Sequence, residues 1–168
     1  LKAINENQNT TYFMDISKDE VEGVDSEFKF GRNASVGAAE EVIWDGGGDY
    51  TFLETAETLD IVSTSVIDAV GLPGAHTVIV FGLDSNYEEI SEVFTLTGTS
   101  TVTTQKSFLR TFRALILASG TNSPVNDANK GNITIEGHDT STLQAKILAG
   151  NGQTLMSVYT VPAGKTGY

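Results

Sequence analysis

The sequence predicts an all-β fold, an antiparallel β-sandwich or jelly-roll-like domain with an irregular N-terminal arm. Glycine accounts for 17 of the 168 residues, and serine and threonine are abundant, a mixture that favours short strands and turns over long helices. From residue 58 onward, short apolar or alternating segments recur between clusters of turn-forming residues. Before that point acidic residues gather and no regular period is evident. These three observations place the sandwich at residues 58–168 and an acidic arm or excursion at residues 1–57.

The net charge of −12 belongs mainly to the arm. Residues 1–60 hold 14 acidic and 4 basic side chains, a net charge of −10, whereas residues 61–168 hold 8 acidic and 6 basic ones, a net charge of −2. A chain with this balance repels nucleic acid phosphates, so we expect no nucleic acid partner. The acidic segment either binds a basic protein surface or keeps the protein soluble.

We expect the arm to be irregular and anchored by aromatic side chains. Long connections without regular structure are uncommon in compact domains and often serve a partner. Ser17 and Glu20 have the spacing of a capping box, which leaves open either a short helix over residues 18–23 or an irregular loop there. The expected anchors, which with segment 13–30 are also expected interface residues, are Phe13, Phe28, Phe30 and Trp44.

The segment from residue 58 predicts about eight strands. Leu59 and Ile61 alternate with Asp60, as in a strand with one buried face. Residues 77–83 are continuously apolar, as in a strand covered on both faces. The expected strands are LDIVS, TVIVFGL, EISEVFTLTG, STVTTQ, residues 109–118, ITIEG, LQAKIL and TLMSVYTV.

Residues 109–118 fit either a strand or a helix, and their glycine- and serine-rich flanks favour the strand. Strand alternation places Leu109, Thr111, Leu115 and Leu117 on one side. Arg110 and Arg113 then face opposite sides. As the one close pair of arginines in an acidic chain, they are expected interface residues, pairing with the acidic arm of the same or a neighbouring copy.

The stretch VIWDGGGDYTF, residues 42–52, offers three interpretations. A phosphate loop needs a lysine after its glycines, but here the glycines lie between Asp45 and Asp49 and no lysine follows. A calcium site needs an ordered series of oxygen ligands that neither this loop nor the turn at residues 84–88 matches, although a structural cation stays open. A tight glycine turn is favoured, with Trp44 packed on one side and Tyr50 or Phe52 on the other.

Residues suited to catalysis are scarce. The absence of cysteine excludes disulfides and thiolate metal sites. His76 and His138 lie at loop edges, and no G-x-S-x-G motif is present, although a Ser/His/Asp triad stays open because its members can be distant in sequence. No apolar run approaches the roughly 20 residues that span a bilayer. We therefore expect no enzyme, no cofactor and no membrane partner.

Several segments of the sequence resemble those of a known class of proteins. They include WDGGGDYTF, TVIVFGLDSNYEEISEVFTLTGTSTVTTQKSFLR and ILAGNGQTLMSVYTVPAGKTGY. From about residue 31 to the end, the chain resembles small virion structural proteins of tailed bacteriophages. The resemblance lies in short sequence segments and not in catalytic motifs. It therefore implies a structural role in the virus particle and not a reaction.

The resemblance implies a capsid decoration (cement) protein that binds the major capsid protein on the outer surface of the head. By analogy with such proteins, it also implies self-association as a homotrimer. A neck, tail or head-spike component and a receptor- or carbohydrate-binding virion module remain as alternatives. The chain begins without methionine and ends just after PAGKTG, so we expect sequence to be missing at one or both ends.

Overall fold

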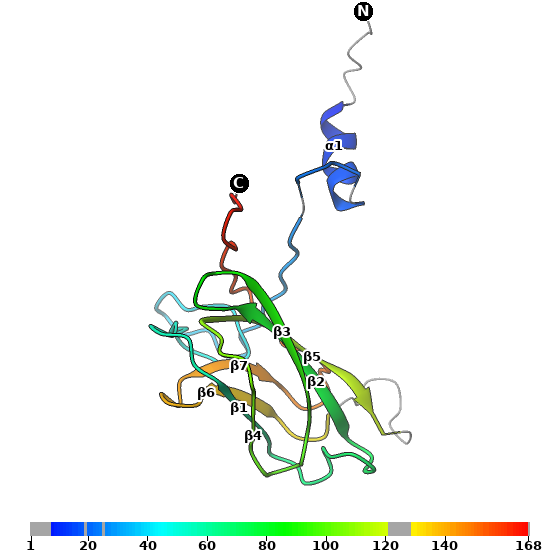
Figure 1. The fold of residues 1–168 in the computed structure, drawn as a ribbon, viewed down its shortest axis with the longest axis vertical. Helices are drawn as coiled ribbons and strands as arrows, with labels where there is room; N and C mark the ends of the chain where they lie inside the picture. Colours follow the sequence, from blue (N-terminus) through cyan, green and yellow to red (C-terminus); the bar gives the residue numbers. More distant parts are fainter. Residues whose placement is uncertain (1–7, 19, 25, 121–128, 168) are drawn as a thin grey trace, which may run out of the picture.

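The computed structural model describes residues 8–18, 20–24, 26–120 and 129–167, with the side chains of residues 8–11 and 13 outside the description. As predicted, the described chain is almost entirely β, a sandwich of two antiparallel sheets (Figure 1). One sheet has the order β4-β1-β6-β7 and the other the order β3-β2-β5. The strands are β1 Leu59–Ser63, β2 Ala75–Leu83, β3 Glu89–Thr95, β4 Val102–Thr103, β5 Arg110–Ser119, β6 Ile133–Gly137 and β7 Leu143–Ile147.

The core lies between the two sheets. Strands β1 and β6 alternate strictly between buried and half-buried residues, and they bring Ile61 and Ile135 opposite each other. From the other sheet, Val78 and Val80 of β2 and Ala114 of β5 join the same cluster, and all five residues have no solvent exposure. Full burial of an aliphatic side chain of this size contributes about 1.5–3 kcal/mol, so this alternation holds the sheets together.

Strand β5 confirms the prediction of a strand at residues 109–118, but its alternation is interrupted. Opposite β2, Phe81 pairs with Arg113 whereas Gly82 pairs with Thr111, so one extra residue bulges between them. Thr111 and Ala114 are consequently both buried, although they lie three residues apart. The prediction that Arg110 and Arg113 face opposite sides is therefore wrong, because both lie outside the core.

The same bulge changes the predicted face of β5 further along. Leu117, expected beside Thr111, is 53% exposed, whereas Ile116 packs against the core. Residues 154–161, the last expected strand, form no regular strand. They make one isolated bridge, between Met156 and Trp44, and single hydrogen bonds to neighbouring segments.

The described part of the arm begins with a helix, α1, Gln8–Ser17. The helix ends where the Ser17 hydroxyl donates to the Met14 carbonyl, so Ser17 does not cap a following helix. Of the two alternatives left open for residues 18–23, the structure favours the irregular one, because the described residues there form turns and no helix. Figure 1 shows α1 away from both sheets, at the end of the sandwich where the C-terminal segment also emerges.

The four expected anchors of the arm lie in different places. Trp44 is 3% exposed and belongs to the core, together with Leu53. Phe28 and Phe30 are 68% and 73% exposed, so they do not anchor the arm on its own sandwich. The side chain of Phe13 lies outside the described part of the chain.

Candidate interaction surface

The outward face of the β4-β1-β6-β7 sheet is polar. Residues paired across strands lie on the same face, so the register identifies its members. Val62 lies beside Thr134 in these rows of paired residues. Leu143 pairs with Glu136 across a register shift, but it packs against the core and not outward. The outward residues of these rows are Asp60, Val62, Thr103, Thr134, Glu136 and Lys146. This composition is typical of a sheet face that meets water.

The outward face of the β3-β2-β5 sheet is apolar instead. One row of paired residues runs Val93, Ile79, Leu115 across the three strands, and the next row places Phe81 between Ser91 and Arg113. Val93 is 53% exposed, as is Leu117 further along β5. We call the five outward apolar residues the apolar face: Ile79, Phe81, Val93, Leu115 and Leu117. None of them belongs to the core cluster or packs against it.

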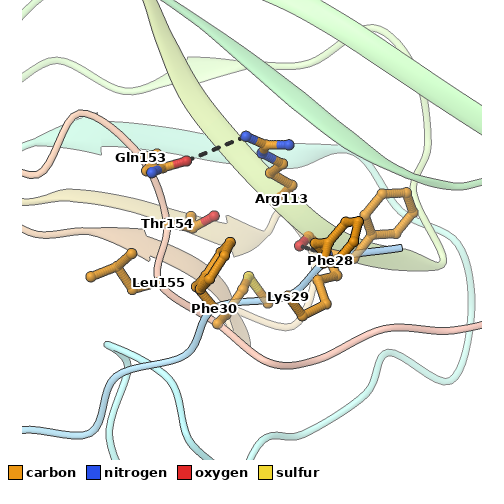
Figure 2. A pocket seen from close by; sticks show the side chains of 9 residues that line it. Phe28, Lys29, Phe30, Arg113, Gln153, Thr154 and Leu155 are labelled. Carbon is orange, nitrogen blue, oxygen red and sulfur yellow. Dashed lines mark hydrogen bonds between the residues drawn. The ribbon is translucent and has the colours of Figure 1, made fainter. Parts of the chain in front are cut away.

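The arm crosses one end of the apolar face and encloses a hollow of about 200 Å³ there. Figure 2 shows the hollow between arm residues 28–30, Arg113 of β5 and the segment Gln153–Leu155. Arg113 donates to the Gln153 side-chain oxygen at 3.3 Å. A second hollow, of about 310 Å³, adjoins the first at Arg113 and is also lined by Glu27, Phe81 and Glu89.

Lys29 holds the arm at this position. Its ammonium donates to the Phe112 carbonyl at 2.6 Å and lies 4.7 Å from the centroid of the Phe112 ring and 5.2 Å from that of Tyr159. Burial lowers the pKa of Lys29, and the nearby Glu27 carboxylate partly offsets the shift. Three residues on, the Arg32 backbone N–H donates to the Leu155 carbonyl. The arm is thus attached by a few specific contacts and not by a broad apolar interface.

Lys29→Met should free the arm without unfolding the sandwich. Methionine keeps the length of the side chain but removes the charged donor and the cation–π contacts, which together contribute about 1–3 kcal/mol. Hydrogen exchange at residues 28–32 should rise, while exchange in β2 and β5 stays unchanged. Unchanged protection of residues 28–32 would show that Lys29 does not hold the arm.

Two other expected interface residues, Arg110 and Trp44, already make contacts within the chain. Arg110 donates to the Leu53 and Leu109 carbonyls, each at 2.8 Å, and its guanidinium lies over the rings of Phe52 and Tyr87. Trp44 is too buried for direct contact with a partner. Of the residues predicted from sequence, the structure therefore brings Phe28, Phe30 and Arg113 together at the hollow.

The glycine stretch is a tight turn beneath Trp44, as predicted. Gly47 and Gly48 have φ angles of 75° and 64°, and a Cβ on Gly46 would come within 2.3 Å of the indole ring. The Trp44 indole N–H donates to the Gly48 carbonyl, and Tyr50 meets the indole edge-on at a centroid distance of 4.9 Å. The turn therefore shapes the packing of its aromatic neighbours.

The flanking Asp45 is paired with a cation of the chain itself. Its side chain is almost wholly buried, with Oδ1 3.7 Å from the Arg32 Nε and Oδ2 accepting from Asn151. Burial raises the pKa of Asp45, and Arg32 and Asn151 oppose the shift. Within the described ranges, no group of three or more His, Cys, Asp or Glu side chains is arranged to hold a metal ion.

His138 forms a pair with Asp60 on the polar sheet face. The His138 Nδ1 lies 3.0 Å from both carboxylate oxygens, and Thr103 donates to the same carboxylate at 2.6 Å. The hydrogen bond to Asp60 and its negative charge raise the pKa of His138. Burial alone would raise the pKa of Asp60, but the bonds from Thr103 and His138 outweigh it and lower that pKa.

This pair makes stability depend on pH. A raised histidine pKa gives a contribution that is complete below about pH 6.5 and is lost as the pH rises through the folded-state value. The lowered pKa of Asp60 gives a contribution that is complete above about pH 4 and is lost in stronger acid. His138→Gln should lower the thermal midpoint at about pH 5.5 and leave it nearly unchanged at about pH 8.5. An equal effect at both values would contradict this assignment.

Two buried carboxylates that the sequence did not reveal organise the loops at the sheet ends. The Asp68 side chain has no solvent exposure and accepts hydrogen bonds from the N–H groups of Ala75, Lys130 and Gly131 and from the Ser63 hydroxyl. Glu57, 5% exposed, accepts from the N–H groups of residues 139 and 140 and fixes the β6–β7 turn. Both carboxylates have roles in the fold.

Comparison with protein-family models, curated proteins and solved structures finds no match to this chain. The described residues include no helix with the length and apolar character needed to cross a membrane.

Proposed function

We propose that this chain is a structural protein of a tailed-bacteriophage particle: a capsid decoration (cement) protein that binds the major capsid protein on the outside of the head. The observation that best supports the proposal is the arm, which extends away from the sandwich (Figure 1). The resemblance of residues 31–168 to small virion structural proteins supports the same proposal. Many weakly bound copies stabilise a shell effectively, because each binds only the assembled state and multivalency raises the effective concentration.

The arm has the properties of a segment that is completed by a partner. Helices shorter than about 12–15 residues are marginal in water, and α1 has 10 residues. Tyr12 and Met14 are 47% and 58% exposed on it, and Phe28 and Phe30 are more exposed still. Acidic residues at positions 15, 20, 22 and 27 accompany these apolar side chains. The partner surface that suits this arm is basic with apolar hollows.

Binding to isolated heads of the encoding phage tests the proposal. The double substitution Glu20→Lys with Glu22→Lys lies on exposed arm residues, so the thermal midpoint should stay constant while affinity for heads falls on the order of tenfold. The matched control is Glu54→Lys with Glu88→Lys, which changes the net charge equally on exposed residues outside segment 13–30. Equal binding by both variants, or no binding by the unmodified protein, would count against the arm as the capsid-binding segment.

A receptor- or carbohydrate-binding module is the second candidate, favoured by one observation. Phe28 and Phe30 expose aromatic surface beside the polar side chains of Arg113 and Gln153 (Figure 2). Trp44 cannot serve as a sugar platform, because it is buried. Titration with glycans of the host surface separates this candidate, since Phe30→Ala would abolish glycan binding but leave the acidic arm intact. The number of copies per particle distinguishes a neck, tail or spike component from a decoration protein.

A further inference from the structure

We propose that a second copy of this chain covers the apolar face, with the two copies packed face to face about a two-fold axis that runs along β2. Strand β2 is apolar on both of its faces. Its inward residues Val78 and Val80 are fully buried, while its outward residues Ile79 and Phe81 are only half-buried. A continuously apolar strand is typical of a sheet covered on both faces, yet the described chain covers only one.

The comparison between the two sheets strengthens this inference. The outward rows of the β4-β1-β6-β7 sheet carry Asp60, Glu136 and Lys146, whereas the central outward row of the β3-β2-β5 sheet carries Val93, Ile79 and Leu115. A contiguous apolar patch that is confined to one face indicates an interaction site. Apolar residues without such a role would be scattered over both faces.

The charges around the apolar face indicate a second copy as the occupant. Arg113 is exposed, and within the described chain it forms no ion pair with a carboxylate. Glu89 and Glu27 line the same hollow as Arg113 and are exposed too. A two-fold interface joins a patch to itself, so the patch must carry both members of each contact. This one does.

The strand order shows how the charges meet. A two-fold axis along β2 places β5 of one copy over β3 of the other without shifting residues along the strands. Because Arg113 shares a row with Ser91, each Arg113 then lies over Ser91 of the other copy. Glu89 is two residues away on the same side of β3, within reach of the guanidinium. Leu115 correspondingly lies over Val93, and Ile79 over its own equivalent.

This arrangement also has a consequence for the arms. Rotation about an axis along the strands keeps both copies pointing the same way. The arm and the C-terminal segment leave each sandwich at the same end, near the β2–β3 turn, where the Ala163 N–H donates to the Tyr87 carbonyl (Figure 1). Both arms of the pair therefore emerge at one end, available to one surface. The pairing rests on the apolar face and the charges beside it, and does not depend on what the arm binds.

Sedimentation velocity of the whole chain at micromolar concentrations tests the pairing. The expected species has twice the 17.9 kDa chain mass. Val93→Lys should return the protein to monomers. The matched control is Val62→Lys, the same substitution on the polar sheet face, which should leave the pair intact. A monomer at every concentration would overturn the proposal, and so would a trimer or a pair that survives Val93→Lys.

Charge exchange at the rim provides a second and independent variant. Arg113→Glu changes an exposed side chain, so the fold should persist. The dissociation constant of the pair should rise on the order of tenfold. Adding Glu89→Arg should restore most of the affinity, because the contact is remade with reversed charges. A double variant that associates no better than Arg113→Glu alone would overturn the assigned contact. Should Val93→Lys fail to fold, the charge exchange decides the question.

Discussion

Asp68→Asn is expected to lower the free energy of unfolding by at least about 3 kcal/mol and the thermal midpoint by on the order of 10 °C. The carboxylate accepts three backbone N–H groups at 2.8–2.9 Å and the Ser63 hydroxyl at 2.5 Å, all without contact with water. An amide has one acceptor oxygen, and its NH₂ group would face N–H donors. The substitution leaves buried donors unsatisfied, and each costs about 1–3 kcal/mol.

Asp84→Asn is the matched control, with the same chemical change in a second loop. There a single oxygen, Oδ1, accepts the N–H groups of both Asn86 and Glu88, so an asparagine keeps both bonds. We expect a change of less than about 0.5 kcal/mol. Urea unfolding of both variants measures the difference. Equal loss of stability in the two variants would show that the Asp68 network does not hold the loops as described.

Trp44→Ala is expected to cost about 3–5 kcal/mol, the range for removing a large aromatic side chain from a core. The indole is 3% exposed, lies against Gly46, and meets Tyr50 edge-on. Its N–H bond to the Gly48 carbonyl is also lost. Because Trp44 contacts Gly48 and Tyr50 within its own segment and bridges to Met156, the cavity would loosen both of these non-strand segments.

Phe30→Ala provides the comparison, since Phe30 is 73% exposed and should change stability by less than about 0.5 kcal/mol. Urea titrations of the two variants separate a core residue from a surface aromatic. We expect the loss of stability in Trp44→Ala to be several times larger than that in Phe30→Ala. Equal effects would contradict the packing described for the glycine turn.

The strands of the sandwich were predictable because their evidence is local. Leu59 and Ile61 alternate with polar neighbours, and turn residues bound each segment, so β1, β2, β3, β6 and β7 match expected strands. The bulge beside Arg113 was not predictable, because it depends on the register with β2 and leaves no mark in the sequence of β5. The error about Arg110 follows from that bulge alone.

The arm and the buried carboxylates were harder to predict for different reasons. Helix α1 contains two adjacent threonines, which favour strands as much as helices, so its sequence carries no clear helical signal. Asp68 lies in a loop, and two of its donors, the N–H groups of Lys130 and Gly131, lie 62 and 63 residues further along the chain. Only the fold brings them together. The apolar face did have a signal in the continuous run 77–83.

A reconstruction of the intact virion tests the central claim most directly. We expect density for this sandwich at many equivalent positions on the outside of the head, with the acidic arm lying on the major capsid protein. Hundreds of copies per particle would agree with a decoration protein. Finding the chain only at the neck or tail, in about a dozen copies or fewer, or finding it absent from the particle, would contradict the account.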